Sequence, residues 1–199
     1  MKTVRIVLWG LVLVMAGALG WLTLSMTKTQ EQMAEAPFGV PFQLVGGDGQ
    51  PITEAALRGK PTALFFGFTH CPEVCPTTLF ELDGWMKSVD PDGSKLQAYF
   101  ITVDPERDTP ELLGRYVGNV SDRVKAIAGE PDKIAEVVKG FRVYAKKVPL
   151  DESQPDGDYT MDHTASVFLL DAQGRFKGTI AYGENADTAV KKLENLAKG

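Results

Sequence analysis

The stretch PTALFFGFTHCPEVCPTTL, residues 61–79, decides the fold. Its first eight residues are mostly apolar and rich in aromatics, which is typical of a buried strand. The residues from Cys75 to about Val89 then have helical spacing, because one broad face collects Leu79, Leu82, Trp85, Met86 and Val89. A buried strand therefore leads through a loop with two cysteines into the start of a helix.

Outward from this stretch, the chain alternates between predicted strands and predicted helices. Apolar runs and turn residues predict a hairpin over 42–53, a buried strand over 96–103, a short strand over 124–129 and a second hairpin over 164–182. Helix start and stop signals predict three further helices. One runs from Pro110 to about Val117 and ends at Gly118, the next starts at Pro131, and the last runs from Asn185 to Lys198. This order indicates an α/β sandwich around a central mixed sheet. It also suggests a thioredoxin-like arrangement, in which a buried strand delivers a cysteine loop to a helix N-terminus.

The N-terminal segment is long and apolar enough to span a membrane. Residues 6–22 carry no polar side-chain group except the tryptophan indoles, and 22 uncharged residues separate Arg5 from Lys28. As a helix that span is roughly 33 Å long, against a bilayer core of about 30 Å. Lys2 and Arg5 precede it, so the positive-inside rule leaves the N-terminus cytoplasmic. We expect one transmembrane helix, a single-pass anchor in the cell inner membrane.

A cleaved signal peptide is the alternative to a membrane anchor over residues 1–26. Ala16-Gly17-Ala18 has the small-residue form of a cleavage site, although the apolar run continues past it. Either interpretation places a linker over 27–37 and a domain over 38–199 outside the cytoplasm, in the periplasm of a bacterium. The cysteines then work in an oxidising compartment.

The counts of charged and metal-binding residues exclude several classes of protein. Of the 21 Lys and Arg residues, Lys2 and Arg5 precede the apolar segment, which leaves 19 cationic against 26 acidic side chains, a net charge of −7. Nucleic-acid binding needs clustered cations, so no nucleic-acid partner is expected. Two cysteines exclude a multi-disulfide scaffold and a zinc site of four cysteines.

The pair Cys71 and Cys75 carries the chemistry. Residues four apart on a helix lie on nearly the same face, which puts the two Cα atoms roughly 6 Å apart. That separation suits a disulfide, and it also lets two thiolates hold one metal ion. A structural disulfide across so short a loop would stabilise the fold little. Two thiolates and an imidazole could hold zinc, but the same donors suit copper, which binds more tightly in the affinity series.

Either of the two histidines could complete a metal site. His70 is adjacent to Cys71, and a residue beside a ligand often points away from the shared metal. His163 lies far along the chain, just before a predicted strand, where a loop can project over the same end of the sheet. Geometry alone does not choose between them.

Three motifs, in this order, resemble those of the Sco/SenC family of copper-binding, thioredoxin-like proteins. They are GFTHCPEVCPTTL (67–79), ITVDPERDTPELL (101–113) and DYTMDHTASVFLLD (158–171). The likeness covers about residues 38–197, and an N-terminal anchor also fits the layout of the family. The resemblance implies that Cys71, Cys75 and His163 are ligands of copper, as Cu(I) or Cu(II), and that His70 is a neighbour of the site.

Two aspartates are expected to support these ligands. Asp162 precedes the histidine and can orient its ring by a hydrogen bond. Asp104, in the second motif, has two interpretations: it caps a turn in a charge network with Arg107, or it tunes the cysteine loop. The acidic loop over 149–158 leads into Asp162 and is expected to be mobile.

The resemblance implies a copper metallochaperone that delivers copper to the binuclear copper centre of cytochrome c oxidase subunit II during assembly. The alternative is a thiol–disulfide oxidoreductase, whose redox-active pair Cys71 and Cys75 reduces the acceptor's cysteines or acts in redox signalling. In an oxidising compartment the pair depends on an external thiol reductant. A thiol peroxidase is less favoured, because the motif lacks the signature of a peroxidatic cysteine. His163 discriminates between the first two functions, since only the chaperone needs it.

Overall fold

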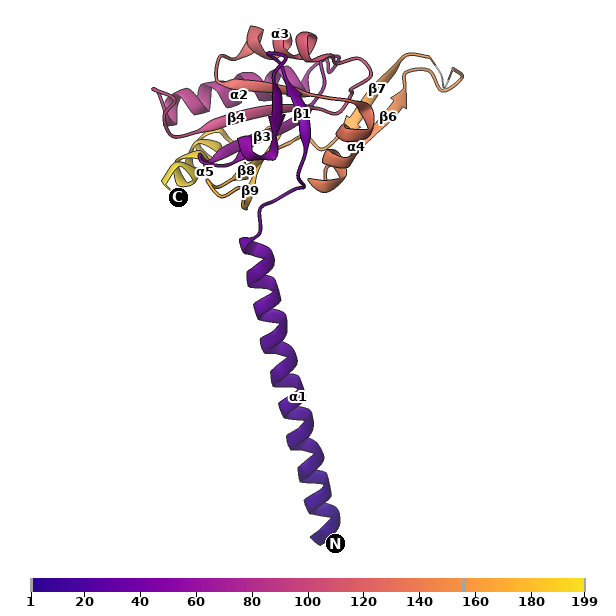
Figure 1. Cartoon of the computed structure of the whole chain (residues 1–199), viewed down its shortest axis with the longest axis vertical. Coiled ribbons are helices and arrows are strands. Elements are labelled where there is room, and N and C mark those ends of the chain that lie inside the picture. Colours follow the sequence, from indigo (N-terminus) through magenta and orange to yellow (C-terminus); the bar gives the residue numbers. More distant parts are fainter. Residues whose placement is uncertain (1, 155–156, 199) are drawn as a thin grey trace. The chain divides into compact units, whose positions relative to one another are not determined.

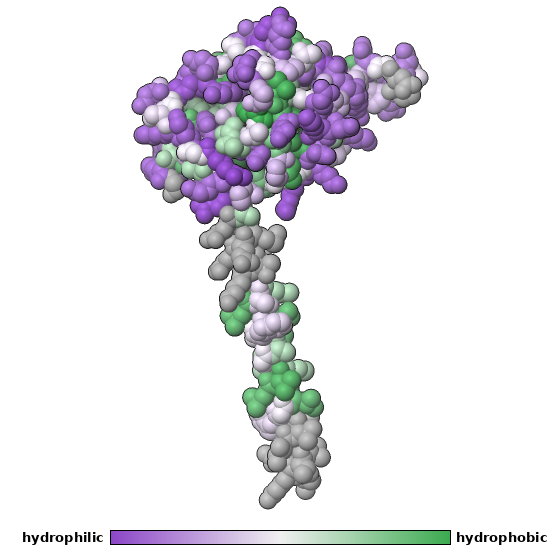
Figure 2. All heavy atoms as spheres, viewed as in Figure 1, coloured by the Kyte–Doolittle hydropathy of each residue, from purple (hydrophilic) through white to green (hydrophobic). Residues whose placement is uncertain are grey.

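The computed structural model describes residues 2–154 and 157–198, which divide into two compact units between Ala36 and Pro37. The first unit is a single helix, α1 (Lys2–Glu35). Its segment Trp9–Met26 is long and apolar enough to cross a membrane, a test that a signal sequence also passes. Figure 2 shows apolar side chains on the surface of this helix.

The linker expected over 27–37 is helical up to Glu35. This segment has no glycine or proline before Pro37, and it contains the good helix formers Gln, Glu, Met and Ala. The residue before a proline is restricted to extended conformations, so the helix has a reason to end at Ala36 but none to end earlier.

The second unit is built on a seven-stranded mixed sheet, in the order β2-β1-β5-β4-β3-β8-β9 (Figure 1). Its strands are β1 (Gln43–Gly46), β2 (Pro51–Thr53), β3 (Thr62–Gly67), β4 (Gln97–Thr102), β5 (Val124–Ala128), β8 (Ser166–Leu170) and β9 (Phe176–Ala181). The helices are η1, one turn of 3-10 helix (Glu54–Leu57), α2 (Val74–Val89), α3 (Pro110–Val120), α4 (Pro131–Gly140) and α5 (Ala186–Lys198). Strand β3 pairs parallel to β4 and antiparallel to β8. The expected α/β sandwich with a central mixed sheet is confirmed.

Strand β3 lies in the middle of the core, and all six of its residues are buried. Successive side chains of a strand point to opposite faces of the sheet. Phe66 accordingly contacts Phe141, which follows α4, whereas Phe65 contacts Phe100 of β4. A strand buried on both faces gives the cysteine loop that follows it a rigid starting point.

Helix α3 is longer than expected. Thr109 caps its N-terminus as predicted, because the Thr109 Oγ1 accepts a hydrogen bond from the Leu112 backbone N–H at 3.2 Å. The helix passes Gly118 and ends at Val120. Gly118 does not have a positive φ, so it is an ordinary helical residue whose cost of about 1 kcal/mol is too small to end the helix.

A second, two-stranded sheet was not predicted. It consists of β6 (Ala145–Pro149) and β7 (Tyr159–His163), and it projects from the domain beside α4 (Figure 1). Asp162 and His163 therefore lie within a strand and not in the loop before one. The sequence of β6, AKKVP, lacks the alternation of a half-buried strand, because four of its five residues are polar, exposed or proline.

Candidate metal centre

The cysteine loop connects β3 to α2. Cys75 lies in the first turn of α2, whereas Cys71 lies in the loop ahead of the helix, so the pair does not share one helix face as the spacing had indicated. The loop nevertheless folds back, and the backbone N–H of Cys75 donates to the Cys71 Sγ at 3.3 Å. Both cysteines are free thiols. Both cysteines are buried, but Cys71 is 9% exposed and Cys75 is fully shielded, so Cys71 is the more accessible thiol of the pair.

Strand β3 approaches the Cys75 thiol so closely that its last residue must be glycine. A Cβ on Gly67 would lie 2.8 Å from the Cys75 Sγ and 2.7 Å from the Phe100 ring. Neither neighbour has room to move, because both are fully buried.

The variant Gly67→Ala is therefore expected to lose about 1–3 kcal/mol of unfolding free energy, the usual cost of overpacking. Urea denaturation of the reduced, metal-free protein measures this loss. Gly84→Ala is the matched control, because Gly84 lies in α2 with open space around it and should gain up to about 1 kcal/mol. Equal effects of the two substitutions would contradict the close approach.

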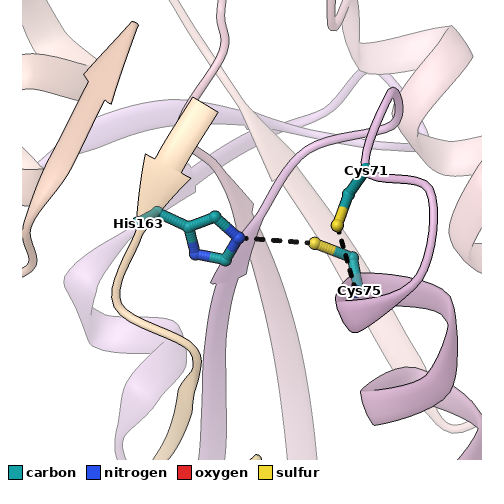
Figure 3. Close-up of side chains that lie close together, drawn as sticks. All are labelled: Cys71, Cys75 and His163. Atoms are coloured by element: carbon teal, nitrogen blue, oxygen red, sulfur yellow. Dashed lines mark hydrogen bonds between the residues drawn. The ribbon is translucent and has the colours of Figure 1, made fainter. Parts of the chain in front are cut away.

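His163 comes to the cysteines from the end of β7 (Figure 3). Its Nε2 lies 3.6 Å from the Cys75 Sγ. The ring contacts Phe65 and Phe68, with centroid distances of 6.3 and 5.7 Å. Its Nδ1 lies 3.1 Å from the Thr164 carbonyl oxygen, which can only accept, so Nδ1 carries a hydrogen and Nε2 faces the thiols.

The donor atoms of Cys71, Cys75 and His163 all lie within 4.8 Å of one another. Metal–ligand bonds of about 2.0–2.3 Å, as for zinc with imidazole and thiolate, put two donors on one ion roughly 3–4.5 Å apart. The three side chains therefore fit one ion with little movement.

The two thiols share one proton. A hydrogen bond from the Cys75 thiol lowers the pKa of the Cys71 thiol to about 4, although burial opposes this. The same interaction with Cys71 raises the pKa of Cys75, and burial raises it further. At neutral pH the pair is one thiolate, on the more accessible Cys71, and one thiol.

This asymmetry predicts the pH dependence of alkylation. An unperturbed thiol has a pKa of about 8.5 and loses reactivity as the pH falls below it. Cys71 stays a thiolate down to about pH 4, so its alkylation by iodoacetamide should change little between pH 8 and 5 and fall only below that range. Mass spectrometry of the reduced, metal-free protein measures the rate. In Cys75→Ala, which lacks the donor, the inflection should move up, and an inflection near pH 8.5 in the native protein would contradict the assignment.

The other histidine is placed elsewhere. His70 is exposed, and its Nδ1 lies 3.0 Å from the Thr69 Oγ1. It groups with the carboxylates of Asp104 and Asp108 and not with the two sulfur atoms. The structure thus agrees with the choice that the resemblance made between the two histidines.

Asp162 does not face the site. It is exposed on β7, opposite Lys146 of β6, and strand alternation directs it away from the side that carries His163. The Thr164 carbonyl takes the orienting role expected of this aspartate. No sequence pattern indicates this role, because every residue has a backbone carbonyl.

Asp104 belongs to a charge network rather than to the cysteine loop. Its buried carboxylate accepts hydrogen bonds from the Arg107 Nε and, at 2.8 Å, from the Tyr159 hydroxyl. Of its two interpretations, the structure supports the network with Arg107.

Asp108, which residue spacing alone does not single out, is the carboxylate that contacts the cysteine loop. It is buried, and it accepts hydrogen bonds from the Thr69 N–H at 3.1 Å, from the Thr69 hydroxyl and from the Thr102 hydroxyl at 2.7 Å. Burial raises its pKa. Asp108 thereby ties the end of β4 to the segment just before Cys71. Its position in the motif VDPERDTP, residues 103–110, is the one sequence feature that points to this role.

Comparison with known proteins identifies the family. A family model described as SCO1/SenC matches residues 30–198. The chain belongs to the SCO1/SenC family. This confirms the resemblance drawn from the three motifs.

Individual relatives agree with this assignment. Protein SCO2, mitochondrial, of Saccharomyces cerevisiae is 35% identical over 156 residues, which cover 78% of this chain and 51% of that protein, so this chain spans about half the length of its relative. The structure of Bradyrhizobium japonicum ScoI with copper bound matches at a TM-score of 0.71 with 43% identity, over 80% of this chain and 99% of that one. BsSco, a member of the Sco family of cytochrome c oxidase assembly proteins, matches at a TM-score of 0.59 over 82% and 96% of the two chains. Its identity of 20% shows the fold alone. The thioredoxin-like fold of this SCO1/SenC protein is thereby confirmed.

Proposed function

We propose that the protein is a copper metallochaperone, in which Cys71, Cys75 and His163 hold the ion that is delivered. The observation that carries this proposal is the convergence of two thiol sulfurs and one imidazole nitrogen within 4.8 Å, although 88 residues separate Cys75 from His163. Without a metal, two thiols and an imidazole at this distance contribute little to the stability of the fold. With a metal, the same three atoms can coordinate one ion.

The donor chemistry favours copper. Soft thiolates favour Cu(I), imidazole suits either oxidation state, and copper exceeds zinc in the affinity series. Copper is also the ion bound in the ScoI structure that matches this chain. The chain has two cysteines and two histidines, and three of these four side chains form the site. A site with three protein donors leaves a coordination position for a ligand from the acceptor, which would approach on the side of Cys71, the less buried of the two thiols.

The acceptor that we propose is the binuclear copper centre of cytochrome c oxidase subunit II. Support comes from membership of a family with oxidase assembly proteins. We further propose that α1 anchors the protein in the inner membrane, with residues 38–199 on the extracytoplasmic side, because Lys2 and Arg5 precede the apolar segment. An external thiol reductant then keeps Cys71 and Cys75 reduced.

Thiol–disulfide exchange is the second candidate, and the unequal thiols favour it. The Cys71 thiolate would attack a partner disulfide, forming a mixed disulfide and releasing one partner thiolate. Cys75, after losing its proton, would attack the Cys71 sulfur and release the second partner thiolate. The partner gains two electrons, and the chain is left with a Cys71–Cys75 disulfide for the external thiol to reduce.

Two transfer reactions with the soluble domain of subunit II separate these functions. In the first, the copper-loaded chain in detergent is mixed with the copper-free acceptor, whose cysteines are reduced. In the second, the reduced, copper-free chain is mixed with the acceptor, whose cysteines are oxidised. The chaperone proposal expects the binuclear centre to form in the first mixture, followed by its absorption spectrum. Retention of all copper by the chain, with reduction of the acceptor in the second mixture, would favour the oxidoreductase.

A further inference from the structure

Strand β7, which carries His163, lies outside the main sheet. Within the described residues it pairs with β6 alone, in the two-stranded sheet. The position of His163 relative to the cysteines therefore depends on the packing of its ring on Phe65 and Phe68 and on the contacts between this hairpin and the rest of the domain.

One group of these contacts joins Arg107 to Tyr159, the first residue of β7. The Arg107 Nη1 donates to the Tyr159 carbonyl oxygen at 2.9 Å, and the guanidinium lies 3.8 Å from the centre of the Tyr159 ring. Buried Asp104 closes the group, because it accepts from both Arg107 and the Tyr159 hydroxyl. Charge-assisted bonds of this kind, shielded from solvent, are stronger than exposed ones.

We infer that Arg107 and Tyr159 form a clamp that positions His163 for copper without touching the copper ligands. This inference rests on the proposed function. Tyr159, Met161 and His163 alternate onto one face of β7, so a contact that fixes Tyr159 also fixes the face that presents the imidazole.

The turn that carries Arg107 also holds the other half of the site. In residues 104–108, Arg107 contacts β7, and Asp108 holds Thr69, two residues before Cys71. Backbone N–H groups of Arg107 and Asp108 donate to the Asp104 carbonyl oxygen, which keeps the turn compact. This one turn thus contacts both the strand that carries the imidazole and the segment that leads to the Cys71 thiol.

A second contact in the same turn provides a matched control. The Glu106 carboxylate and the Lys147 ammonium also join the turn to the hairpin, but their side chains are 53% and 46% exposed. An exposed ion pair contributes little. Glu106→Gln should therefore leave copper affinity within about twofold of the native value, whereas Arg107→Ala removes both the hydrogen bonds and the ring contact.

The test measures copper affinity for the native chain, Arg107→Ala, His163→Ala and the double variant. Each reduced full chain in detergent is titrated with Cu(I) against a competing chelator. Arg107→Ala is expected to weaken binding by about 10- to 100-fold, the usual effect of losing a group that orients a metal ligand. In the His163→Ala background it should cause no further loss. Tyr159→Phe, which keeps the ring but not the hydroxyl, is a milder variant for use if Arg107→Ala does not fold.

A second readout needs no copper. Hydrogen exchange of the backbone amides of residues 159–163 in the metal-free protein should be faster in Arg107→Ala than in the native chain and in Glu106→Gln. Native copper affinity in Arg107→Ala, or an equal loss with and without His163, would overturn the clamp. Native affinity in His163→Ala would instead overturn the copper site itself, and the amide exchange would still report on whether the clamp holds the strand.

Discussion

Replacing His163 with alanine is expected to separate copper binding from thiol exchange. The loss of one of three donors should weaken Cu(I) binding by roughly 100-fold or more. Even the removal of a residue that only hydrogen-bonds to a metal ligand lowers metal affinity by about 10- to 100-fold. The dithiol remains, because the Cys75 N–H still donates to the Cys71 Sγ. Reduction of a model disulfide should therefore continue at a comparable rate.

The chain contains its own control for this experiment. His70→Ala removes the only other histidine, which is exposed and hydrogen-bonded to Thr69, and it should leave copper affinity unchanged. Chelator competition measures affinity, and a stopped-flow assay with a small disulfide measures exchange. The ligand assignment fails if His70→Ala loses copper while His163→Ala keeps it.

Replacing either cysteine alone is expected to abolish copper retention. The two variants should differ in thiol–disulfide exchange, because only one of them should form a mixed disulfide. Cys75→Ser keeps Cys71, the more accessible of the two thiols, so a mixed disulfide should form and persist because the second thiol is absent. Cys71→Ser leaves only Cys75, which is fully buried. Burial shields this thiol and still raises its pKa after Cys71 is replaced, so no mixed disulfide should accumulate.

Mass spectrometry of the intact chain after reaction with an activated disulfide reports the adduct. Urea denaturation shows whether each serine variant is folded. Accumulation of the adduct in Cys71→Ser and not in Cys75→Ser would reverse the roles of the two thiols and contradict the asymmetry of the pair.

The sequence was most informative where a pattern is local. The apolar run of β3, the two cysteines and the helical spacing after Cys75 follow one another without a break, and each predicts its neighbour. Even there, the four-residue spacing predicts that Cys71 lies on the helix, because spacing alone does not reveal that α2 begins only at Val74. The folded loop still brings both sulfurs together.

The sequence was least informative where contacts join distant segments. The hydrogen bonds from Thr69 to Asp108 and from Arg107 to Tyr159 span 39 and 52 residues, and neither leaves a periodic signal. The family resemblance, and not residue spacing, selects His163 over His70. Strand β7 is hard to predict because YTMDH alternates in polarity over only five residues, and its partner strand, AKKVP, does not alternate.

X-ray absorption at the copper edge of the Cu(I)-loaded full chain tests the central claim most directly. We expect one copper per chain with two sulfur neighbours at roughly 2.3 Å and one nitrogen neighbour at roughly 2.0 Å, by analogy with the zinc bonds of the same side chains. The nitrogen neighbour should disappear in His163→Ala. A copper ion surrounded by oxygen and nitrogen alone, or by sulfur alone in the native chain, would contradict the three-residue site.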